Sequence, residues 1–220
     1  MTPQSDLVLH GAPYSVYTRI VRLVLAEKRL AYRLEEVDIF GTDRASPAHR
    51  ARHPFLRIPT LAIDGATIYE TSAIARFLDQ RFPSPPLQPT EPLACARMNT
   101  MISLMDNYAF RGIVWGVFVE RVRKPVQGGA SDDAVIAAGL DTAKTLLSAM
   151  TDALTSHPWL AGDRLTLADV WAAPMFILFD LAAEGRAAID TAPAVRRWLD
   201  RFKERPSAIA TRFPIEATAS

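Results

Sequence analysis

Cysteine is nearly absent from the sequence, which contains only Cys95. Disulfides persist in oxidising compartments, so a chain that cannot form one is typical of a reducing compartment. No apolar run approaches the ~18 residues that a membrane-spanning helix needs. The first ten residues also lack the charged start and long apolar core of a signal peptide. We therefore expect a cytoplasmic protein that does not cross a membrane.

Charge of one sign is also scarce. The 25 basic residues nearly balance the 24 acidic residues, which leaves a net charge of +1 at pH 7. Binding to nucleic acid or to an acidic membrane surface usually requires a strong positive excess. The sequence also lacks a metal-ligand cluster and a glycine-rich phosphate loop. We therefore predict no nucleic-acid partner, no metal and no nucleotide cofactor.

The chain has enough apolar residues for a well-formed core, because 49% of its residues are hydrophobic and 22% are charged. Its 220 residues suit two small domains better than one large one. A proline-rich stretch at 82–89 interrupts both helix and strand. Strand and helix patterns alternate before it, and only helical patterns follow. We predict an α/β domain at 1–82, a linker at 83–91 and an all-helical domain at 92–220.

The clearest local pattern lies between residues 53 and 79. Residues 60–63 alternate as a half-buried strand does, and the Asp-Gly dipeptide at 64–65 is typical of a two-residue hairpin turn. After a second short strand, Glu70 and Thr71 precede a helical pattern. An acid and a hydroxyl at this position suit ordinary helix-start chemistry. They also suit a ligand that binds the exposed N–H groups of the helix.

The order of these motifs resembles the cytosolic glutathione S-transferase family; the matching segments are Ile58-Pro59-Thr60-Leu61, Tyr69-Glu70-Thr71 and Ala73-Ile74. The resemblance implies a thioredoxin-like N-terminal domain, with Pro59 in the cis form, followed by an all-α domain. It implies that the backbone of Ile58 holds the cysteine unit of glutathione like an added strand. Glu70 would pair with the γ-glutamyl ammonium, and Thr71 would bind the neighbouring α-carboxylate.

Ser15 is the first candidate for the catalytic residue. The segment HGAPYSVYTRIVRLVLAEKRL resembles the bacterial serine-type members with a phi- or tau-like N-terminal motif. In these members the serine hydroxyl donates a hydrogen bond to the glutathione sulfur, which favours the reactive thiolate. Alternatively, Ser15 only caps the following helix. Tyr17 is the second choice, because other branches of the family use a tyrosine, and Tyr14 is expected to line the site.

The sequence departs from the family pattern at three places. Threonine stands at 71 where serine is commoner, His53 stands where asparagine is frequent, and Leu56-Arg57 replaces a glycine followed by glutamine or lysine. Arg57 is a candidate for binding the glycyl carboxylate of glutathione in a bidentate manner. It is equally well explained as a solvated charge at a strand edge. Arg44 has a weaker claim to the same role.

A long helix is predicted from about Pro92 to Lys124. Tyr108, Arg111, Trp115 and Phe118 follow one another at spacings of three, four and three, which places them on one face of an α-helix. Such a stripe is more often part of a core than of a substrate site. The resemblance implies a second substrate beside this helix, so we expect an electrophile site formed by Tyr14, Tyr108, Arg111 and Trp115. Farther along, Thr166 and Asp169 predict a capping box, which serves folding.

These expectations combine into one functional hypothesis. The resemblance implies a homodimeric glutathione transferase that uses glutathione as co-substrate and attacks a small hydrophobic electrophile, as in detoxification. Two alternatives stay open. One is another glutathione-dependent activity on the same fold, such as an isomerase, a dehalogenase or a peroxidase; the other is a non-catalytic interaction module. The sequence does not identify the electrophile, because a fold does not specify a reaction.

Overall fold

The computed structural model describes residues 6–41 and 46–217. Their contacts divide the chain into two compact units. The first unit comprises the chain up to Pro86 together with the segment from Pro206 onward, and the second comprises Leu87–Arg205. The sequence analysis placed the segment from Pro206 onward in the helical domain, whereas the contacts group this segment with the α/β unit. The two units are described separately below.

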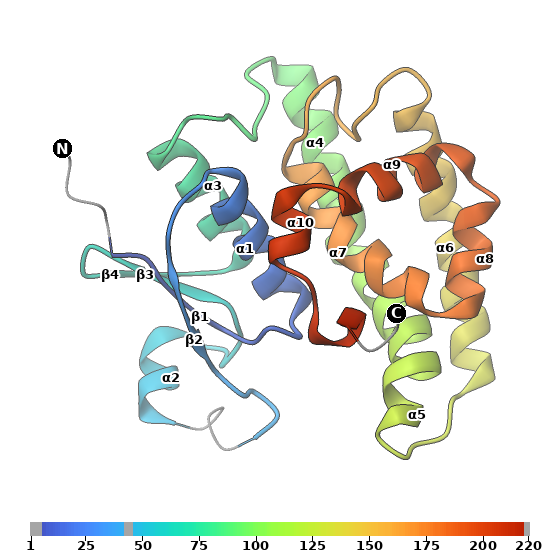
Figure 1. The fold of residues 1–220 in the computed structure, drawn as a ribbon, viewed down its shortest axis with the longest axis horizontal. Coiled ribbons are helices and arrows are strands. Elements are labelled where there is room, and N and C mark those ends of the chain that lie inside the picture. Colours follow the sequence, from blue (N-terminus) through green and yellow to red (C-terminus); the bar gives the residue numbers. More distant parts are fainter. Residues whose placement is uncertain (1–5, 42–45, 218–220) are drawn as a thin grey trace. The chain divides into compact units, whose positions relative to one another are not determined.

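A four-stranded sheet forms the centre of the first unit, with the strand order β2-β1-β3-β4 (Figure 1). The strands are β1 (Val8–Gly11), β2 (Arg33–Glu36), β3 (Thr60–Ile63) and β4 (Ala66–Tyr69). β2 runs parallel to β1, while β3 is antiparallel to both β1 and β4. Three helices complete the order: α1 (Val16–Glu27), α2 (Pro47–Arg52) and α3 (Thr71–Arg81). The predicted thioredoxin-like order is therefore confirmed.

Local sequence signals explain the central elements of this unit. Ile20 and Leu25 lie on the buried face of α1, which packs beside α3, as the helical spacing of apolar residues requires. Leu61 of β3 pairs with Leu9 of β1, and both side chains are fully buried. The β3–β4 turn has positive φ angles at Asp64 and Gly65, as a two-residue hairpin turn of the primed type demands. The predicted hairpin is thus confirmed.

The C-terminal segment returns to α1 through α10 (Pro206–Ala210) and η3 (Pro214–Ala217). Arg19 of α1 is almost completely buried beneath it. Its Nη1 donates to Glu216 Oε1 at 2.6 Å, and its Nη2 donates to the Ala208 carbonyl at 3.3 Å. The guanidinium also lies over the Phe213 ring, with Cζ 4.2 Å from the ring centroid. A buried cation therefore joins the two ends of the chain in one unit.

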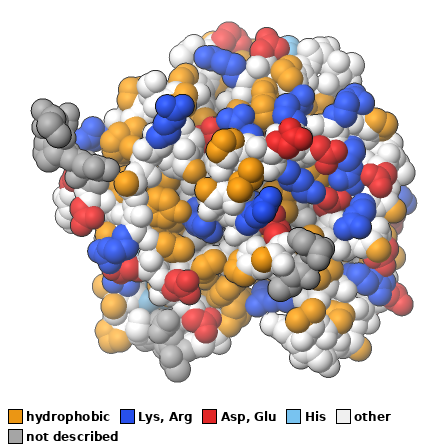
Figure 2. Space-filling model, in the orientation of Figure 1, with side chains coloured by type: hydrophobic (Ala, Val, Ile, Leu, Met, Phe, Trp, Pro, Cys, Tyr) orange, Lys and Arg blue, Asp and Glu red, His pale blue; other side chains and the backbone are white. Residues whose placement is uncertain are grey.

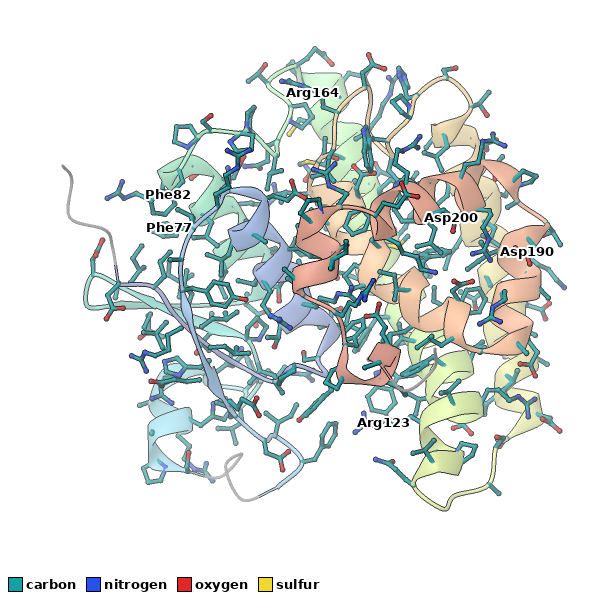
Figure 3. All side chains as sticks on the ribbon, viewed as in Figure 1. Phe77, Phe82, Arg123, Arg164, Asp190 and Asp200 are labelled. Atoms are coloured by element: carbon teal, nitrogen blue, oxygen red, sulfur yellow. The ribbon has the colours of Figure 1, made fainter. Side chains whose placement is uncertain are left out.

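The second unit is entirely helical. It contains α4 (Pro92–Leu104), a wider π-helix η2 (Met105–Arg123), α5 (Lys124–Val126), α6 (Asp133–Leu154), α7 (Leu167–Leu181), α8 (Ala183–Asp190) and α9 (Pro193–Lys203). Nearly all of α7 is buried, so it forms the centre of this unit. On α9, Arg196 contacts Asp190 at 2.8 Å and Asp200 at 3.7 Å, two acids that Figure 3 labels. The long helical path predicted for 92–124 is present.

The capping box at the start of α7 is also confirmed. Asp169 is completely buried, and its carboxylate accepts hydrogen bonds from the backbone N–H groups of Leu160 and Thr166 at 2.9 and 2.8 Å. It also accepts one from Trp198 Nε1 at 2.9 Å. Burial raises the pKa of Asp169, and these hydrogen bonds oppose the rise. The box therefore connects the loop before α7 with α9 as well as capping the helix.

The surface drawn in Figure 2 mixes basic and acidic side chains over much of its area, in keeping with the net charge of +1. Within residues 6–41 and 46–217, every helix is too short or too polar to cross a membrane. The same residues contain no group of three His, Cys, Asp or Glu side chains placed to hold a metal ion.

Candidate functional site

Ser15 lies in the connection between β1 and α1, where it is the N-cap of the helix. Its Oγ accepts a hydrogen bond from the Thr18 N–H at 3.3 Å. Gly11 ends the strand so close to the helix that an added Cβ would lie 2.5 Å from Thr18 Oγ1. The capping bond uses the serine hydroxyl as an acceptor, and its hydrogen is left for donation. Capping and a hydrogen bond to sulfur are therefore compatible roles for the half-buried Ser15.

The two tyrosines near Ser15 differ in their surroundings. Tyr14 is 37% exposed, and its hydroxyl donates to Asp38 Oδ1 at 3.4 Å. Its ring centroid lies 5.7 Å from that of Phe40. Tyr17 lies in the first turn of α1 and is half-buried. Tyr14 is thus engaged with the loop that follows β2, and Tyr17 stays the second candidate for the sulfur contact.

Ile58 and Pro59 precede β3 and are both buried. The peptide bond between them is cis, as the family resemblance implied. The Ile58 side chain packs with Ala12 and Val37. Because Ala12 belongs to the same loop as Ser15, this packing brings the start of β3 next to the start of α1. The structure therefore unites two of the predicted glutathione-binding segments.

Glu70 and Thr71 connect β4 to α3. The register pairs Thr60 with Tyr69, so Pro59 and Glu70 are the next residues at the same end of the hairpin. Glu70 is the N-cap of α3, yet its side chain makes no capping bond and is 60% exposed. Its φ of 67° lies in the left-handed region, which is uncommon for a residue with a side chain. The carboxylate therefore makes no bond to its own helix, while Thr71 is buried at the first helical position.

His53 is a further member of this cluster for which the sequence predicted no role. Its side chain is buried, and Nδ1 accepts a hydrogen bond from the Phe55 N–H at 3.1 Å. Its Nε2 lies 3.6 Å from Glu70 Oε1, and its ring centroid lies 5.0 Å from that of Tyr69. Burial is the main cause that lowers the pKa of His53, and the Glu70 charge opposes it. The signal in the sequence was a histidine where the family usually has asparagine.

The remaining predicted residues are placed as follows. Arg57 is exposed beside Ile58, and Arg44 lies outside the described residues. Tyr108, Arg111 and Trp115 are exposed on η2 of the second unit, but Phe118 is only 5% exposed. The four side chains therefore differ in exposure, and Phe118 is part of the core, which is one of the two roles that the stripe left open. A π-helix has more residues in each turn than an α-helix, so spacings of three and four no longer return to the same face.

Comparison with known families decides where the chain belongs. Residues 9–86 match the model described as "Glutathione S-transferase, N-terminal domain". Residues 133–201 match the model described as "Glutathione S-transferase, C-terminal domain". The chain belongs to the glutathione S-transferase family. The N-terminal model precedes the C-terminal one along the chain, and together they span most of it.

Individual relatives of this glutathione S-transferase family member are distant but match along most of its length. "Glutathione S-transferase 3" of Zea mays is 26% identical over 203 residues, which cover 92% of this chain and 91% of the maize protein. "Maleylacetoacetate isomerase" of Pseudomonas aeruginosa is 28% identical over 199 residues, covering 85% and 86%. The crystal structure of a glutathione S-transferase from Rhodospirillum rubrum has a TM-score of 0.82 at 29% identity, covering 93% and 91%.

Proposed function

We propose that this protein activates the thiol of glutathione and transfers it to a small hydrophobic electrophile, acting as a cytoplasmic homodimer. The observation that carries the proposal is the grouping of three features in the first unit. These are the Ser15 hydroxyl at the start of α1, the backbone of Ile58 before β3, and Glu70 with Thr71 at the start of α3. Packing of Ile58 on Ala12 and pairing of Thr60 with Tyr69 hold these segments together.

Each part of glutathione has a matching group in this assignment. The γ-glutamyl ammonium pairs with Glu70, and the α-carboxylate binds the hydroxyl and N–H of Thr71 at the positive end of α3. The cysteine unit pairs with the backbone of Ile58 in the manner of an added strand. The glycyl carboxylate binds Arg57, with Arg44 as a second candidate. This arrangement directs the sulfur toward Ser15.

The proposed chemistry is a nucleophilic transfer of sulfur. The bound thiol first releases its proton to solvent. The thiolate electron pair then forms a carbon–sulfur bond with the electrophile. In an addition, the electron pair of the attacked double bond moves onto the electrophile; in a substitution, the leaving group departs with the electron pair of its bond. A hydrogen bond to a charged group contributes about 1.5–3 kcal/mol. That energy corresponds to a fall of about one to two units in the thiol pKa. Starting from about 8.5, the bound thiol would then have a pKa of about 6.5–7.5, so a substantial fraction would be ionised near neutral pH.

The first experiment is a calorimetric titration with glutathione, followed by ultraviolet absorbance of the bound thiolate against pH. Ser15→Ala should raise the bound thiol pKa by about one unit or more, with little change in affinity. Ser46→Ala is the matched control, because Ser46 caps α2 through the same kind of bond, accepting from the His49 N–H at 3.2 Å. Both variants lose a helix cap, but only Ser15→Ala should change the thiol pKa. A shift seen in Tyr17→Phe instead would assign activation to the tyrosine.

The second experiment separates binding from activation. Glu70→Ala and Thr71→Ala should each weaken glutathione affinity by about tenfold or more, since each removes a partner of a charged group. Neither should raise the thiol pKa of the glutathione that still binds. Failure of the unaltered protein to bind millimolar glutathione would contradict the proposal and favour the non-catalytic interaction module.

An isomerase is a second candidate, because a relative named maleylacetoacetate isomerase matches 85% of this chain. In an isomerisation the thiolate adds to the substrate and is released again, so glutathione is regenerated. In a transfer, glutathione is consumed in proportion to product. Measuring free thiol during turnover therefore distinguishes the two reactions. Tyr108, Arg111 and Trp115 are our candidates for contacting the second substrate in either case.

A further inference from the structure

Three of the four histidines of the chain are buried in the first unit. His10, His49 and His53 are 5%, 1% and 2% exposed. Burial is the main cause that lowers the pKa of His10 and of His53, and a charge on His49 would lower both further. A proton on one ring therefore disfavours a proton on the next. The lowered pKa values favour the neutral form of His10 and His53 at neutral pH.

The hydrogen bonds of His53 define which nitrogen carries its proton. Nδ1 accepts from the Phe55 N–H at 3.1 Å, so the neutral ring has its hydrogen on Nε2. Nε2 is the atom that faces Glu70 Oε1 at 3.6 Å. The ring is held by Tyr69, whose centroid is 5.0 Å away, and by Phe55 at 6.5 Å. A buried imidazole nitrogen thus lies close to an exposed carboxylate, at a distance slightly longer than a hydrogen bond.

The Glu70 side chain makes no capping bond to its own helix, so the contact with His53 is its ion-pair contact in the first unit. The carboxylate is 60% exposed and is carried on a flexible side chain. A mobile carboxylate loses conformational entropy when it pairs with a ligand, which reduces affinity. A donor held in the core on one side of the carboxylate lowers that loss. The opposite side of the carboxylate is then available to an ammonium group.

We infer that His53 is a positioning residue: its neutral imidazole holds the Glu70 carboxylate in place for the ammonium group of glutathione. The inference rests on the proposed function and adds a regulation of the same site by pH. Protonation of His53 requires a hydrogen on Nδ1, which ends its bond with the Phe55 N–H. It also places a positive charge beside Glu70, where that charge competes with the ammonium group.

The direction of the pH effect follows from the groups that face His53. Glu70 is the charge that raises its pKa, whereas His49 and Arg57 lower it, and burial has the largest effect. His53 therefore gains its proton below the ordinary histidine value of about 6.5. A bound ammonium group makes that proton still less favourable. By linkage, glutathione affinity falls as the pH falls through this titration.

Two substitutions separate the functions of the two ring nitrogens. In His53→Asn, the amide oxygen replaces Nδ1 as acceptor for the Phe55 N–H, but the shorter side chain does not reach Glu70. In His53→Gln, the longer side chain keeps an N–H donor for Glu70 and has no titration in this range. His157→Gln is the control, because His157 is the remaining histidine and pairs with Asp163 on the second unit.

The experiment is calorimetric titration with glutathione at several values between pH 5.5 and 7.5. We expect His53→Asn to bind about two- to fivefold more weakly at pH 7.5, the range for a partly exposed charge contact. Its affinity should also lose the decline at acid pH, while the bound thiol pKa stays unchanged. His53→Gln should keep the affinity at pH 7.5 and lose the acid decline. His157→Gln should behave like the unaltered protein. In a Glu70→Gln background, His53→Asn should have no further effect.

Wild-type affinity and acid decline that persist in His53→Asn would overturn this inference alone. The same conclusion would follow if His53→Asn weakened binding equally in the Glu70→Gln background. If the unaltered protein does not bind glutathione, both this inference and the proposed function fail. If circular dichroism shows that His53→Asn does not fold, His53→Gln is the deciding variant. The positioning role is supported if His53→Gln keeps its glutathione affinity at pH 7.5 and that affinity no longer falls at acid pH. It is refuted if the affinity still falls at acid pH.

Discussion

Replacing Glu216 by alanine tests whether the C-terminal segment stabilises the α/β unit. Glu216 is the acid that pairs with Arg19, a side chain that is 1% exposed on the core side of α1. Burial lowers the pKa of Arg19 to about 10, and the charge of Glu216 is the largest opposing effect. Alanine at this position leaves the guanidinium buried with the Ala208 carbonyl and the Phe213 ring as its remaining contacts.

The expected loss is large for a surface segment near the end of the chain. Removing one partner of a buried ion pair costs about 3–5 kcal/mol. Glu216 is itself 14% exposed, so we expect about 3 kcal/mol, near the lower limit of that range. A whole protein is typically stable by about 5–15 kcal/mol. The Glu216→Ala protein should therefore unfold at a clearly lower urea concentration.

Urea unfolding followed by circular dichroism measures this loss, and Arg19→Met supplies the decisive comparison. Methionine fills much of the same space without a charge, so Arg19→Met/Glu216→Ala should be more stable than Glu216→Ala alone. Asp141→Ala is the control, since it breaks an exposed pair with Lys144 and should cost less than about 1 kcal/mol. The reasoning is refuted if Glu216→Ala costs no more than the control. It is also refuted if the two substitutions are simply additive.

Three further predictions follow from the backbone, the histidines and the capping box. Leu56→Gly should raise the free energy of unfolding by about 0.5–1 kcal/mol in thermal unfolding. The reason is that Leu56 has φ 54°, a region that only glycine adopts without cost. A lower free energy of unfolding would mean that packing of the leucine side chain dominates. Unfolding at pH 5–8 should show stability falling below about pH 6.5 by up to about 1.4 kcal/mol per pH unit for each of His10 and His53. Both have lowered folded pKa values, so the unfolded chain takes up the protons first, and the pH dependence should weaken in His10→Gln/His53→Gln. Thr166→Ala should cost about 1–2 kcal/mol in urea unfolding, since it removes the cap of α7; a smaller cost would mean that Asp169 caps the helix alone.

The parts of the fold that the sequence predicted are those with local causes. Asp64 and Gly65 adopt positive φ angles because the hairpin turn requires them, and both residues tolerate such angles. Thr166 and Asp169 form their capping box within four residues of chain. Such features depend on neighbours in the sequence, so a pattern of residue types is sufficient to identify them.

Other features have no local cause. Arg19 and Glu216 are separated by 197 positions, and each alone resembles an ordinary surface charge on a helix. The contact between His53 and Glu70 also depends on how the hairpin folds back over α2 and its following loop. The π-helical form of η2 was not predicted, because the spacing of residue types alone does not distinguish it from an α-helix. These features arise from tertiary packing, which overrides local patterns.

Backbone conformation supports the same location for the site. Within the described residues, four residues other than glycine have positive φ: Arg29, Leu56, Asp64 and Glu70. Asp64 is explained by the hairpin turn, and Arg29 directly follows the C-cap of α1, where a left-handed residue is common. Leu56 and Glu70 lie outside both patterns, although the Leu56 N–H closes a turn on the His53 carbonyl at 3.0 Å, and such φ angles cost energy that the surroundings must offset. They lie on either side of Ile58 and Pro59 in the sequence, and the loop of Leu56 contains His53. Glycine or asparagine would adopt this φ angle at lower cost, so the carboxylate at position 70 is in keeping with the proposed contact to a ligand.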